Sequence, residues 1–398
     1  MSFTELELKD ICLDMHQGIN TVADKVEYRS KGIPIIQSKN ITSGYLDLDD
    51  VRYLDIDDYE KYKDKYNPNK GDILLCNIGT IGTSLVLKQD SKFLIAWNLF
   101  KLKIDTERFN PKYIKYYLDK LKLINYFDRL LTGGTVKFIN KTKMGQIRIP
   151  ICDIRKQDKI VSVLDKAQEL IDKRKEQIEA LDELVKSQFI EMFGDPVHNP
   201  LGWELKPFLE SGSCKNGMNF SANESGIELQ YLGVGDFKDL SKIDNVNALG
   251  KVSLNQMPSK EYILQDGDIV FVRSNGNKAL VGRCLAVYPN GVATTYSGFC
   301  IRYRKTDENL EIPYLLQVLK TDSIRKNMAG RGANIQNLNQ QILGELMIPV
   351  PPLELQKQFT DFIKQVDKLK FEMEKSLKEL EDNFNSLIQK AFNGELFN

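Results

Sequence analysis

The stretch Ile154–Phe193, IRKQDKIVSVLDKAQELIDKRKEQIEALDELVKSQFIEMF, decides the fold, and Leu353–Phe392 is a second copy of the same pattern. Alternating steps of four and three residues from Ile160 trace a seam that is apolar except at Arg174 and Gln188, as in a coiled coil. A constant shift in numbering maps this seam onto the second stretch without a gap, so the chain contains an internal duplication. The apolar seam positions are Ile160, Leu164, Ile171, Ile178, Leu181 and Val185 in the first stretch and Phe359, Ile363, Val366, Met373, Leu377, Leu380, Phe384 and Leu387 in the second.

Each of these stretches predicts one helix of about 40 residues, roughly 60 Å long. Such a helix either packs onto its own globular neighbour or pairs with its copy, and the narrow seam with charge-balanced flanks favours pairing. The chain between residues 195 and 350 leaves the first helix and enters the second, and a compact domain of this length keeps its ends much closer than ~60 Å. The second helix is therefore expected to run antiparallel to the first, which predicts a rod with one globular domain at each end.

The charge of the chain is balanced in total but not along the sequence. The 398 residues include 55 basic and 55 acidic side chains, for a formal net charge of zero. Residues 112–148 and 273–331 are nevertheless both rich in lysine and arginine. One such basic segment is often only a solvated surface, whereas its recurrence in both halves favours a polyanionic partner.

Cysteine and histidine usage excludes two classes of structure. The six cysteines lack the spacing of a zinc site or of a disulfide framework, and the chain has only two histidines. No basic-then-apolar leader opens the sequence, and no apolar run approaches the length of a membrane span. We therefore expect a cytoplasmic protein without a metal site.

Shorter motifs outside the long helices also occur twice in the same order. Residues 18–20, Gly-Ile-Asn, recur as Gly-Met-Asn at 217–219. A turn, a strand and a glycine-rich loop at 70–82 recur at 266–282. These glycines either turn a hairpin or let the backbone approach a ligand closely.

Each half ends with a further pair of motifs. A polar glycine loop occupies 132–140 in the first half and 331–339 in the second. An Ile-Pro dipeptide and a following glutamine, Gln157 or Gln356, then mark the start of each long helix. Two similar strand-rich domains, each with one or two helices, are predicted, with matching helical stretches at 111–130 and 313–328.

The sequence lacks the motifs of an enzyme that would modify or cleave a nucleic acid. It contains no G-x-x-x-x-G-K-[ST] loop, no G-x-G-x-x-G after a strand, and no D-P-P-Y or N-P-P-Y tetrad. Acid-x-Lys triplets occur at 7–9 and 204–206, but they lack a preceding Pro-Asp and stand where a domain opens. We therefore predict no catalytic residues.

The order of these motifs, given twice over essentially the whole chain, resembles the specificity subunit of type I DNA restriction-modification systems. The resemblance implies an α+β protein with a pseudo-twofold internal repeat, in which two target recognition domains are separated by two long antiparallel helices that form a coiled coil. The implied domains are 1–150 and 195–350 for recognition, with spacer helices at 151–194 and 351–398. Each recognition domain would read one half of a split double-stranded DNA site.

The resemblance also implies partners. Methyltransferase subunits, two in number, would dock on the frame, and a restriction or motor subunit would join them. S-adenosylmethionine, ATP and magnesium are expected on those partners, with no cofactor on this chain.

Polar side chains on glycine-flanked loops are the candidates for contacts with DNA. Lysine and arginine attract phosphates and pair with guanine, while asparagine and glutamine pair with adenine. The predicted DNA-binding residues are Gln37, Lys39, Asn40, Asn77, Thr80, Lys137 and Lys141 in the first half and Arg273, Asn275, Asn277, Lys278, Arg331, Asn334 and Gln336 in the second. Each of them taken singly suits a phosphate contact or a capping role as well as base reading. The alternative for the whole chain is a structural adaptor that binds protein partners without reading DNA.

Overall fold

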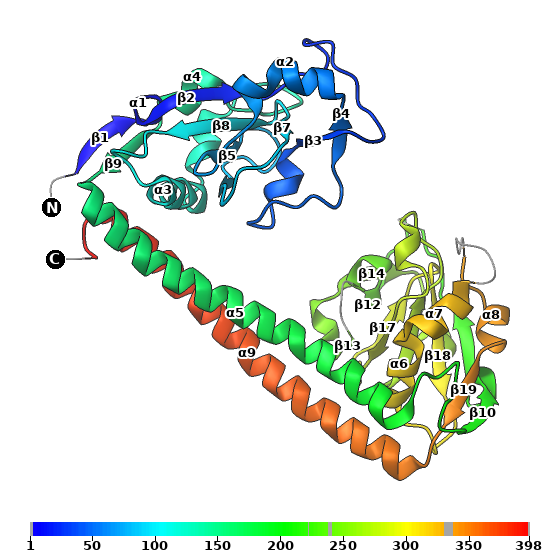
Figure 1. The fold of residues 1–398 in the computed structure, drawn as a ribbon. Helices are drawn as coiled ribbons and strands as arrows, with labels where there is room; N and C mark the ends of the chain where they lie inside the picture. Colours follow the sequence, from blue (N-terminus) through cyan, green and yellow to red (C-terminus); the bar gives the residue numbers. More distant parts are fainter. Residues whose placement is uncertain (1–2, 222, 238–240, 330–336, 397–398) are drawn as a thin grey trace. The chain divides into compact units, whose positions relative to one another are not determined.

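The computed structural model describes residues 3–221, 223–237, 241–329 and 337–396 (Figure 1). The chain divides into two compact units. The first unit comprises Met1–Glu176 and Lys375–Asn398, and the second comprises Gln177–Glu374. The boundaries between the two units therefore lie within the two long helices. The boundaries of the recognition domains proposed from the sequence lie at the helix ends, and they remain a prediction.

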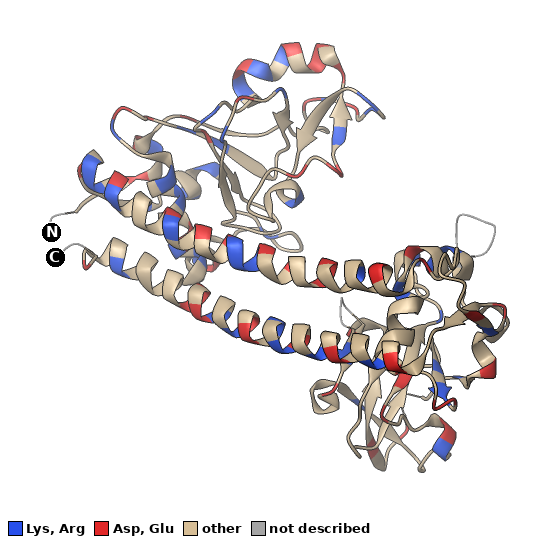
Figure 2. Cartoon of the chain, turned by 60° about the horizontal axis from the view of Figure 1, so that its bottom comes forward, with Lys and Arg blue, Asp and Glu red and all other residues tan. Residues whose placement is uncertain are grey.

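The two predicted long helices are present as α5 (Ile154–Phe193) and α9 (Leu353–Asn393). Lysine and arginine alternate with aspartate and glutamate along both helices (Figure 2). A residue with a left-handed backbone follows each helix closely, Gly194 with φ 74° and Gly394 with φ 84°, as glycine favours at helix C-termini. The glycine that follows each long helix is therefore a stop signal.

In each unit, one half of α5 packs against one half of α9 in antiparallel sense. In the first unit, Ile160 and Leu164 of α5 share a core with Ile388 and Phe392 near the end of α9. Lys175 of α5 also pairs with Glu381 of α9 at 3.0 Å. Because the start of α5 lies against the end of α9, the pairing direction agrees with that expected from the connectivity.

The second unit holds the other half of the same pairing. Phe189 and Phe193 of α5 pack edge-on against Phe359 of α9, with ring centroids 5.5 Å apart in both pairs. The Lys370 ammonium, the polar residue of the second seam, lies 2.7 Å from both carboxylate oxygens of Asp182. This ion pair joins α5 to α9 within the second unit and favours one register of the two helices. All the seam positions named above are buried or half-buried.

The described residues in the globular part of the first unit form three β-sheets and four α-helices. A four-stranded sheet has the order β2-β8-β5-β6, a three-stranded sheet has the order β4-β3-β7, and β1 pairs with β9. The strands are β1 (Thr4–Glu7), β2 (Cys12–Gln17), β3 (Ile33–Ile36), β4 (Arg52–Leu54), β5 (Ile73–Cys76), β6 (Ser84–Val86), β7 (Leu94–Ile95), β8 (Leu99–Ile104) and β9 (Arg148–Ile151). The helices are α1 (Leu8–Ile11), α2 (Ile56–Tyr66), α3 (Pro111–Leu123) and α4 (Lys141–Gly145).

The second unit repeats this plan with small additions. Its sheets have the orders β11-β18-β15-β16-β13 and β14-β12-β17, and β10 pairs with β19. The strands are β10 (Glu204–Pro207), β11 (Gly212–Asn216), β12 (Ile227–Leu232), β13 (Lys242–Ile243), β14 (Gly250–Leu254), β15 (Asp268–Val272), β16 (Cys284–Val287), β17 (Thr294–Tyr296), β18 (Cys300–Lys305) and β19 (Met347–Val350). The helices are α6 (Ile312–Lys320), α7 (Asp322–Ala329) and α8 (Gln340–Gly344). The predicted α+β class with an internal repeat is confirmed.

The central strand of each larger sheet separates two cores. In β5, Ile73 and Leu75 face the core shared with the long helices, while Leu74 and Cys76 face the core against the three-stranded sheet. Strand β15 divides its side chains between two cores in the same way. A strand that is buried on both faces is apolar throughout, which explains why these segments read as continuous apolar runs.

A joint with the same hydrogen bonds in both units holds the start of each long helix against its globular part. The Gln157 side chain accepts a hydrogen bond from the backbone N–H of Asn110 at 2.9 Å and donates to the carbonyl of Cys152 at 2.8 Å. The Gln356 side chain repeats both bonds, with the N–H of Glu311 at 2.9 Å and the carbonyl of Pro351 at 2.8 Å. The repeated glutamine of the sequence is therefore a structural tie between each long helix and the helix that packs beside it.

The repeated Ile-Pro dipeptide belongs to the same joint. The Tyr113 hydroxyl of α3 donates to the Pro150 carbonyl at 2.6 Å, and the Tyr314 hydroxyl of α6 donates to the Pro349 carbonyl at 2.8 Å. Burial raises the pKa of both tyrosines far above the ordinary value, so both hydroxyls remain protonated donors. Sequence analysis had singled out neither tyrosine.

One predicted helix of the second unit is divided. The sequence predicted a continuous helix over 313–328, but α6 ends at Lys320 and α7 starts at Asp322. The residue between them, Thr321, has extended backbone angles (φ −63°, ψ 145°), and its hydroxyl donates to the Val318 carbonyl at 2.7 Å. In the described part of the chain, no helix is long and apolar enough to cross a membrane.

Candidate nucleic-acid interface

In the first unit, five loops that carry most of the predicted DNA-binding residues are joined by hydrogen bonds. The Asn77 N–H donates to the Asn98 carbonyl at 3.2 Å, and the Asn77 carbonyl accepts from the Ile139 N–H at 3.0 Å. The Asn98 side chain donates to the Ser38 hydroxyl at 3.0 Å. We call residues 17–20, 37–41, 77–82, 96–98 and 132–139 the first loop cluster.

The second unit contains an equivalent assembly. The Arg273 N–H donates to the Phe299 carbonyl and the Leu338 N–H donates to the Arg273 carbonyl, both at 2.8 Å. Arg273 therefore takes the structural place of Asn77, and Phe299 takes that of Asn98. We call residues 217–219, 233–236, 273–277, 297–299 and 337–339 the second loop cluster.

Two glycines explain why the repeated Gly-x-Asn motif opens each cluster. A Cβ atom on Gly18 would lie 2.3 Å from the Ile95 carbonyl oxygen, and one on Gly217 would lie 2.0 Å from the Ser297 carbonyl oxygen. Any side chain at these positions would push the motif away from the neighbouring turn. The glycines thus allow the close backbone approach by which the following residue, Ile19 or Met218, bridges to that turn.

The predicted residues of the first half divide into buried supports and exposed side chains. Asn40 and Asn77 are buried, and their amides donate to the Asp50 carbonyl and the Ile139 carbonyl. Gln37 is the N-cap of η1 (Ser38–Ile41), a short 3₁₀ helix. In this structure these three side chains shape the loops from within. The exposed predicted residues are Lys39, which pairs with Asp50, and Thr80, Lys137 and Lys141.

Some of the predicted residues of the second half lie outside the residues that the structure describes. These are Arg331, Asn334 and Gln336. The Asn275 side chain accepts from the Asn277 N–H at 2.7 Å, and the Asn277 side chain accepts from the Ala279 N–H at 3.1 Å. Arg273 is half-buried, with its guanidinium 3.3 Å from the Gly298 carbonyl oxygen. Asn277 and Lys278 are exposed.

The basic segment of the first half does not form one surface. Lys112 pairs with Asp165 of α5 at 2.6 Å, and Lys120 bonds the Asn393 side chain of α9 at 2.9 Å. These two lysines therefore face the long helices, while Lys137 and Lys141 lie in or beside the first loop cluster. The sequence interpretation of a single basic sector is corrected here, because helix α3 turns part of its charge toward α5 and α9.

Charged residues inside the two central sheets differ between the units. In the second unit, the buried Asp268 carboxylate accepts two hydrogen bonds from the Arg304 guanidinium, at 2.7 and 2.8 Å. In the first unit, burial raises the pKa of the equivalent Asp72 and lowers that of Lys101. A bidentate arginine pair compensates a buried carboxylate better than a distant lysine does.

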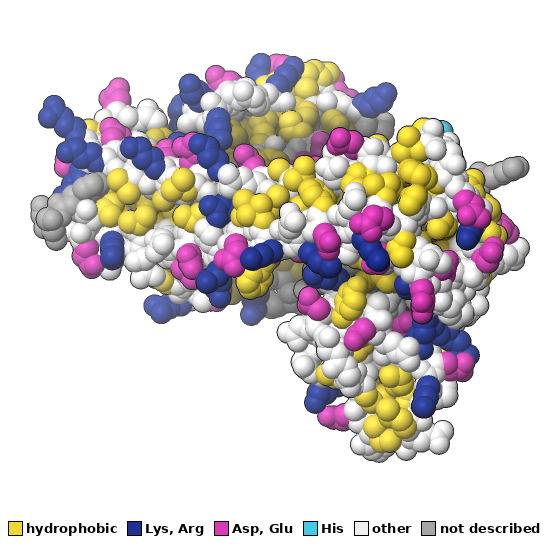
Figure 3. Space-filling view, turned by 90° about the horizontal axis from the view of Figure 1, so that it is seen from below, with side chains coloured by type: hydrophobic (Ala, Val, Ile, Leu, Met, Phe, Trp, Pro, Cys, Tyr) yellow, Lys and Arg dark blue, Asp and Glu magenta, His cyan; other side chains and the backbone are white. Residues whose placement is uncertain are grey.

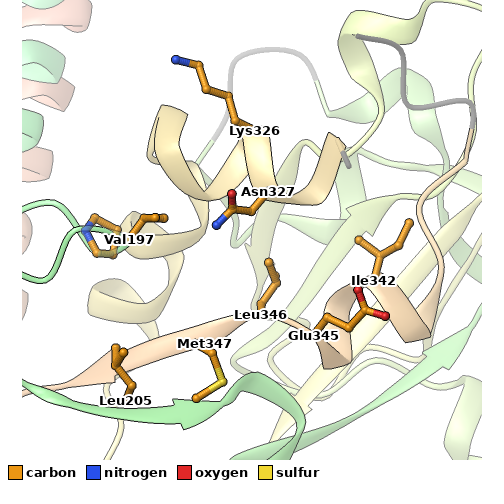
Figure 4. A pocket seen from close by; sticks show the side chains of 9 residues that line it. Val197, Leu205, Lys326, Asn327, Ile342, Glu345, Leu346 and Met347 are labelled. Carbon is orange, nitrogen blue, oxygen red and sulfur yellow. The ribbon is translucent and has the colours of Figure 1, made fainter. Parts of the chain in front are cut away.

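A separate hollow of about 570 Å³ lies in the second unit, between α7, α8 and the β10–β19 pair (Figure 4). Its lining is mostly apolar, including Leu205, Leu346 and Met347, with Lys326 and Glu345 among the polar members. No group of three or more His, Cys, Asp or Glu residues that could hold a metal ion occurs within the described ranges. We assign no chemistry to this hollow.

The long helices expose apolar side chains as well as charges. Apolar side chains gather along the helices in the view from below (Figure 3). Leu170 of α5 in the first unit and Leu369 of α9 in the second are both exposed. These two leucines occupy equivalent positions of the duplicated sequence, so each unit presents the same apolar residue on a helix surface.

Comparison with known proteins identifies the family. The chain matches the family described as type I restriction modification DNA specificity domain twice, over residues 2–181 and 202–382. It is 25% identical to the StySPI specificity subunit of Salmonella potsdam, over 98% of this chain and 86% of the relative. It is 22% identical to the EcoKI specificity subunit of Escherichia coli K12 over the same shares.

A solved structure supports the same fold. It comes from a study of complex assembly and conformational transition of the type I R-M system, and its chain superposes with a TM-score of 0.60 at 16% identity, covering 99% of this chain and 98% of that chain. The two matched domains span most of the sequence and contain the two loop clusters. The chain therefore belongs to the type I restriction modification DNA specificity family, with two copies of the domain.

Proposed function

We propose that the chain is the DNA sequence-recognition subunit of a type I restriction-modification complex. The observation that carries this proposal is that two loop clusters with the same hydrogen-bond plan stand in a chain that the specificity domain matches twice. Binding and catalysis are kept apart in this proposal: the chain reads DNA, while partner subunits supply S-adenosylmethionine, ATP and magnesium chemistry.

Each unit reads one half of a split DNA target. The clusters share a backbone plan but expose different side chains, Thr80 and Lys137 in the first cluster against Asn277 and Phe299 in the second. A hydroxyl, an ammonium, an amide and an aromatic ring present different hydrogen-bonding and apolar groups to base edges. Two unlike clusters therefore suit two unlike half-sites separated by bases that are not read.

Replacing residues 1–150 with the corresponding domain of another specificity subunit is expected to change one half of the methylated motif and leave the other half intact. The reason is that the first loop cluster lies wholly within these residues, while the second cluster is untouched. The measurement is sequencing-based detection of methylated bases in cells that carry the chain with matched methyltransferase subunits. An unsplit motif, or a motif that survives the exchange in both halves, would favour the protein-binding adaptor instead.

Methyltransferase subunits dock on the exposed apolar residues of the long helices. Leu170 and Leu369 are related by the internal duplication, so a subunit that binds around one of them finds an equivalent surface around the other. This supports two methyltransferase subunits per chain. Exposed apolar groups on a surface that is otherwise charged are typical of interaction sites.

Substituting Leu170 with glutamate is expected to remove one methyltransferase subunit from the complex, because a carboxylate would have to lose its water in an apolar contact. Leu369→Glu is expected to remove the other, and the double substitution both. The mass of the assembled complex, measured by light scattering or native mass spectrometry, checks this. Glu179→Gln, at an exposed position of α5, provides a charge control that should leave the stoichiometry unchanged. A double variant that still assembles fully would place the docking surface elsewhere.

A further inference from the structure

An exposed aromatic ring stands on equivalent turns of the two loop clusters. Trp97 is 43% exposed and Phe299 is 60% exposed. The turn that carries Trp97 is closed by a 2.9 Å hydrogen bond from the Leu99 N–H to the Ala96 carbonyl. The turn that carries Phe299 is closed by a 2.8 Å bond between residues 300 and 297. Both units thus leave a large ring in water on a tight turn between two buried strands.

The backbone of Trp97 is held at both of its polar groups. Its N–H donates to the Ile19 carbonyl at 2.9 Å, and its carbonyl accepts from the Gln17 side chain at 2.7 Å. These bonds fix the Trp97 backbone beside the buried residues Ala96 and Leu99. The ring is therefore displayed on a fixed support.

Phe299 is fixed in the same manner by different groups. Its N–H donates to the Ser297 hydroxyl at 3.1 Å. Its carbonyl accepts from the N–H groups of Arg273 at 2.8 Å and Ser274 at 3.3 Å. The Arg273 guanidinium also donates to the Gly298 carbonyl at 3.3 Å, so this arginine positions the turn.

The two rings leave their turns from neighbouring positions. Phe299 is equivalent to Asn98, so Gly298 is the residue of the second unit that is equivalent to Trp97. A Cβ atom on Gly298 would lie 2.0 Å from the Asn219 side-chain oxygen, so a side chain at this position would require the Asn219 side chain to move. The aromatic residue has moved by one position, and each ring reaches a different point beyond its turn.

On the basis of the function proposed above, we propose that Trp97 and Phe299 are specificity-determining residues whose rings contact bases of the two half-sites. A rigid aromatic ring loses little conformational freedom on binding and removes a large apolar area from water. In a DNA groove it can contact a thymine methyl group or the face of an unstacked base. A contact to bases, unlike one to phosphates, strengthens binding to the target more than binding to other DNA.

The chain offers a matched control for each ring. Ile56 is 46% exposed and begins α2, directly after the end of β4 that pairs with the first residue of β3. The Trp97 turn instead follows β7, beside the last residue of β3. In the second unit, Met257 is 50% exposed and follows the end of β14 that pairs with the first residue of β12, whereas the Phe299 turn lies beside the last residue of β12. Both controls are thus apolar residues at the opposite end of the same small sheet.

The experiment measures the affinity of the complete complex, at one fixed salt concentration, for a duplex with the mapped target and for duplexes with one half-site scrambled. Trp97→Ala is expected to weaken binding to the target about ten-fold, because the loss of one base contact costs about a factor of ten in affinity. The same substitution is expected to weaken binding to a duplex scrambled in the first unit's half-site less than about two-fold, because that duplex lacks the contacted base. Phe299→Ala should do the same for the other half-site. Trp97→Phe should restore most of the loss, while Ile56→Ala and Met257→Ala should leave both affinities unchanged.

The fluorescence of Trp97 gives a second readout. The chain contains two tryptophans, and Trp203 bonds the Phe193 carbonyl where α5 ends. Emission from Trp97 should therefore change on titration with the target duplex, and the change should vanish in Trp97→Phe. Equal losses on target and scrambled duplexes, or unaltered emission, would overturn the proposal. If the unsubstituted complex binds all duplexes equally, the proposed function itself fails, and this inference fails with it.

Discussion

Replacing Gln356 with alanine is expected to lower the free energy of unfolding of the second unit by about 4 kcal/mol. The side chain is fully buried and makes three hydrogen bonds, to the Glu311 N–H and to the carbonyls of Pro351 and Asn309. Its loss leaves one donor and two acceptors without this partner, at about 1–3 kcal/mol for each buried group that stays unsatisfied. Urea unfolding followed by Trp203 emission measures the effect, because Trp203 lies in the second unit.

Two matched variants test the cause of this loss. Gln157→Ala should destabilise the first unit to a similar extent, because Gln157 bonds Asn110, Cys152 and Arg108 in the same pattern, and Trp97 reports on that unit. Gln168→Ala, which removes an exposed contact with Asp172 within α5, should change stability by less than about 0.5 kcal/mol. Losses of equal size in all three variants would show that the joint contributes no more than any helix glutamine.

Substituting Asp268 with asparagine is expected to destabilise the second unit by about 3 kcal/mol. The carboxylate is almost fully buried and is bonded twice by the Arg304 guanidinium, and it also accepts from the Gln265 N–H at 2.8 Å. An amide can keep one of these bonds, but it leaves a partly buried guanidinium without its counter-charge. The midpoint and slope of the urea transition, followed by Trp203 emission, give the change in free energy.

The equivalent substitution in the first unit should cost much less. Burial holds the pKa of Asp72 above its ordinary value of 3.8, so the ionised form is less favourable in the folded chain than in the unfolded chain. Stability of the first unit should therefore rise, not fall, as pH is lowered through the folded pKa of this group, and Asp72→Asn should remove that dependence. An Asp72→Asn loss as large as that of Asp268→Asn would contradict the difference in pairing.

The bounds of the long helices could be predicted from the local sequence. The predicted start and end of α5 coincide with the observed bounds, and α9 extends one residue beyond the predicted Phe392. A 40-residue amphipathic pattern with a glycine stop contains enough local information to set both ends. The break between α6 and α7 was missed because Thr321 carries no strong stop signal, and its extended backbone depends on the packing around it.

The exposure of the side chains in the candidate interface could not be predicted from the local sequence. The sequence identified the glycine loops that form the clusters. It predicted a DNA contact equally for the buried Asn40 and Asn77 and for the exposed Thr80 and Lys137. Asparagine suits an exposed base contact and an internal loop tie equally well, because the same amide group serves both. Only the fold buries the first pair. Sequence also passed over Trp97, because an aromatic residue between two apolar strands reads as part of the core.

The sequence by itself determined the internal duplication, the two long helices with their inward-facing seams, and the order of paired motifs that places the chain in its family. These features are periodic or repeated, and so they can be read without knowledge of distant contacts. The tertiary structure alone decided that Gln157 and Gln356 tie each helix to its neighbour, that Asp268 is paired while Asp72 is not, and which loop residues face water. Each of these depends on a partner from a distant part of the sequence, and burial or exposure of a polar side chain is a property of that partnership.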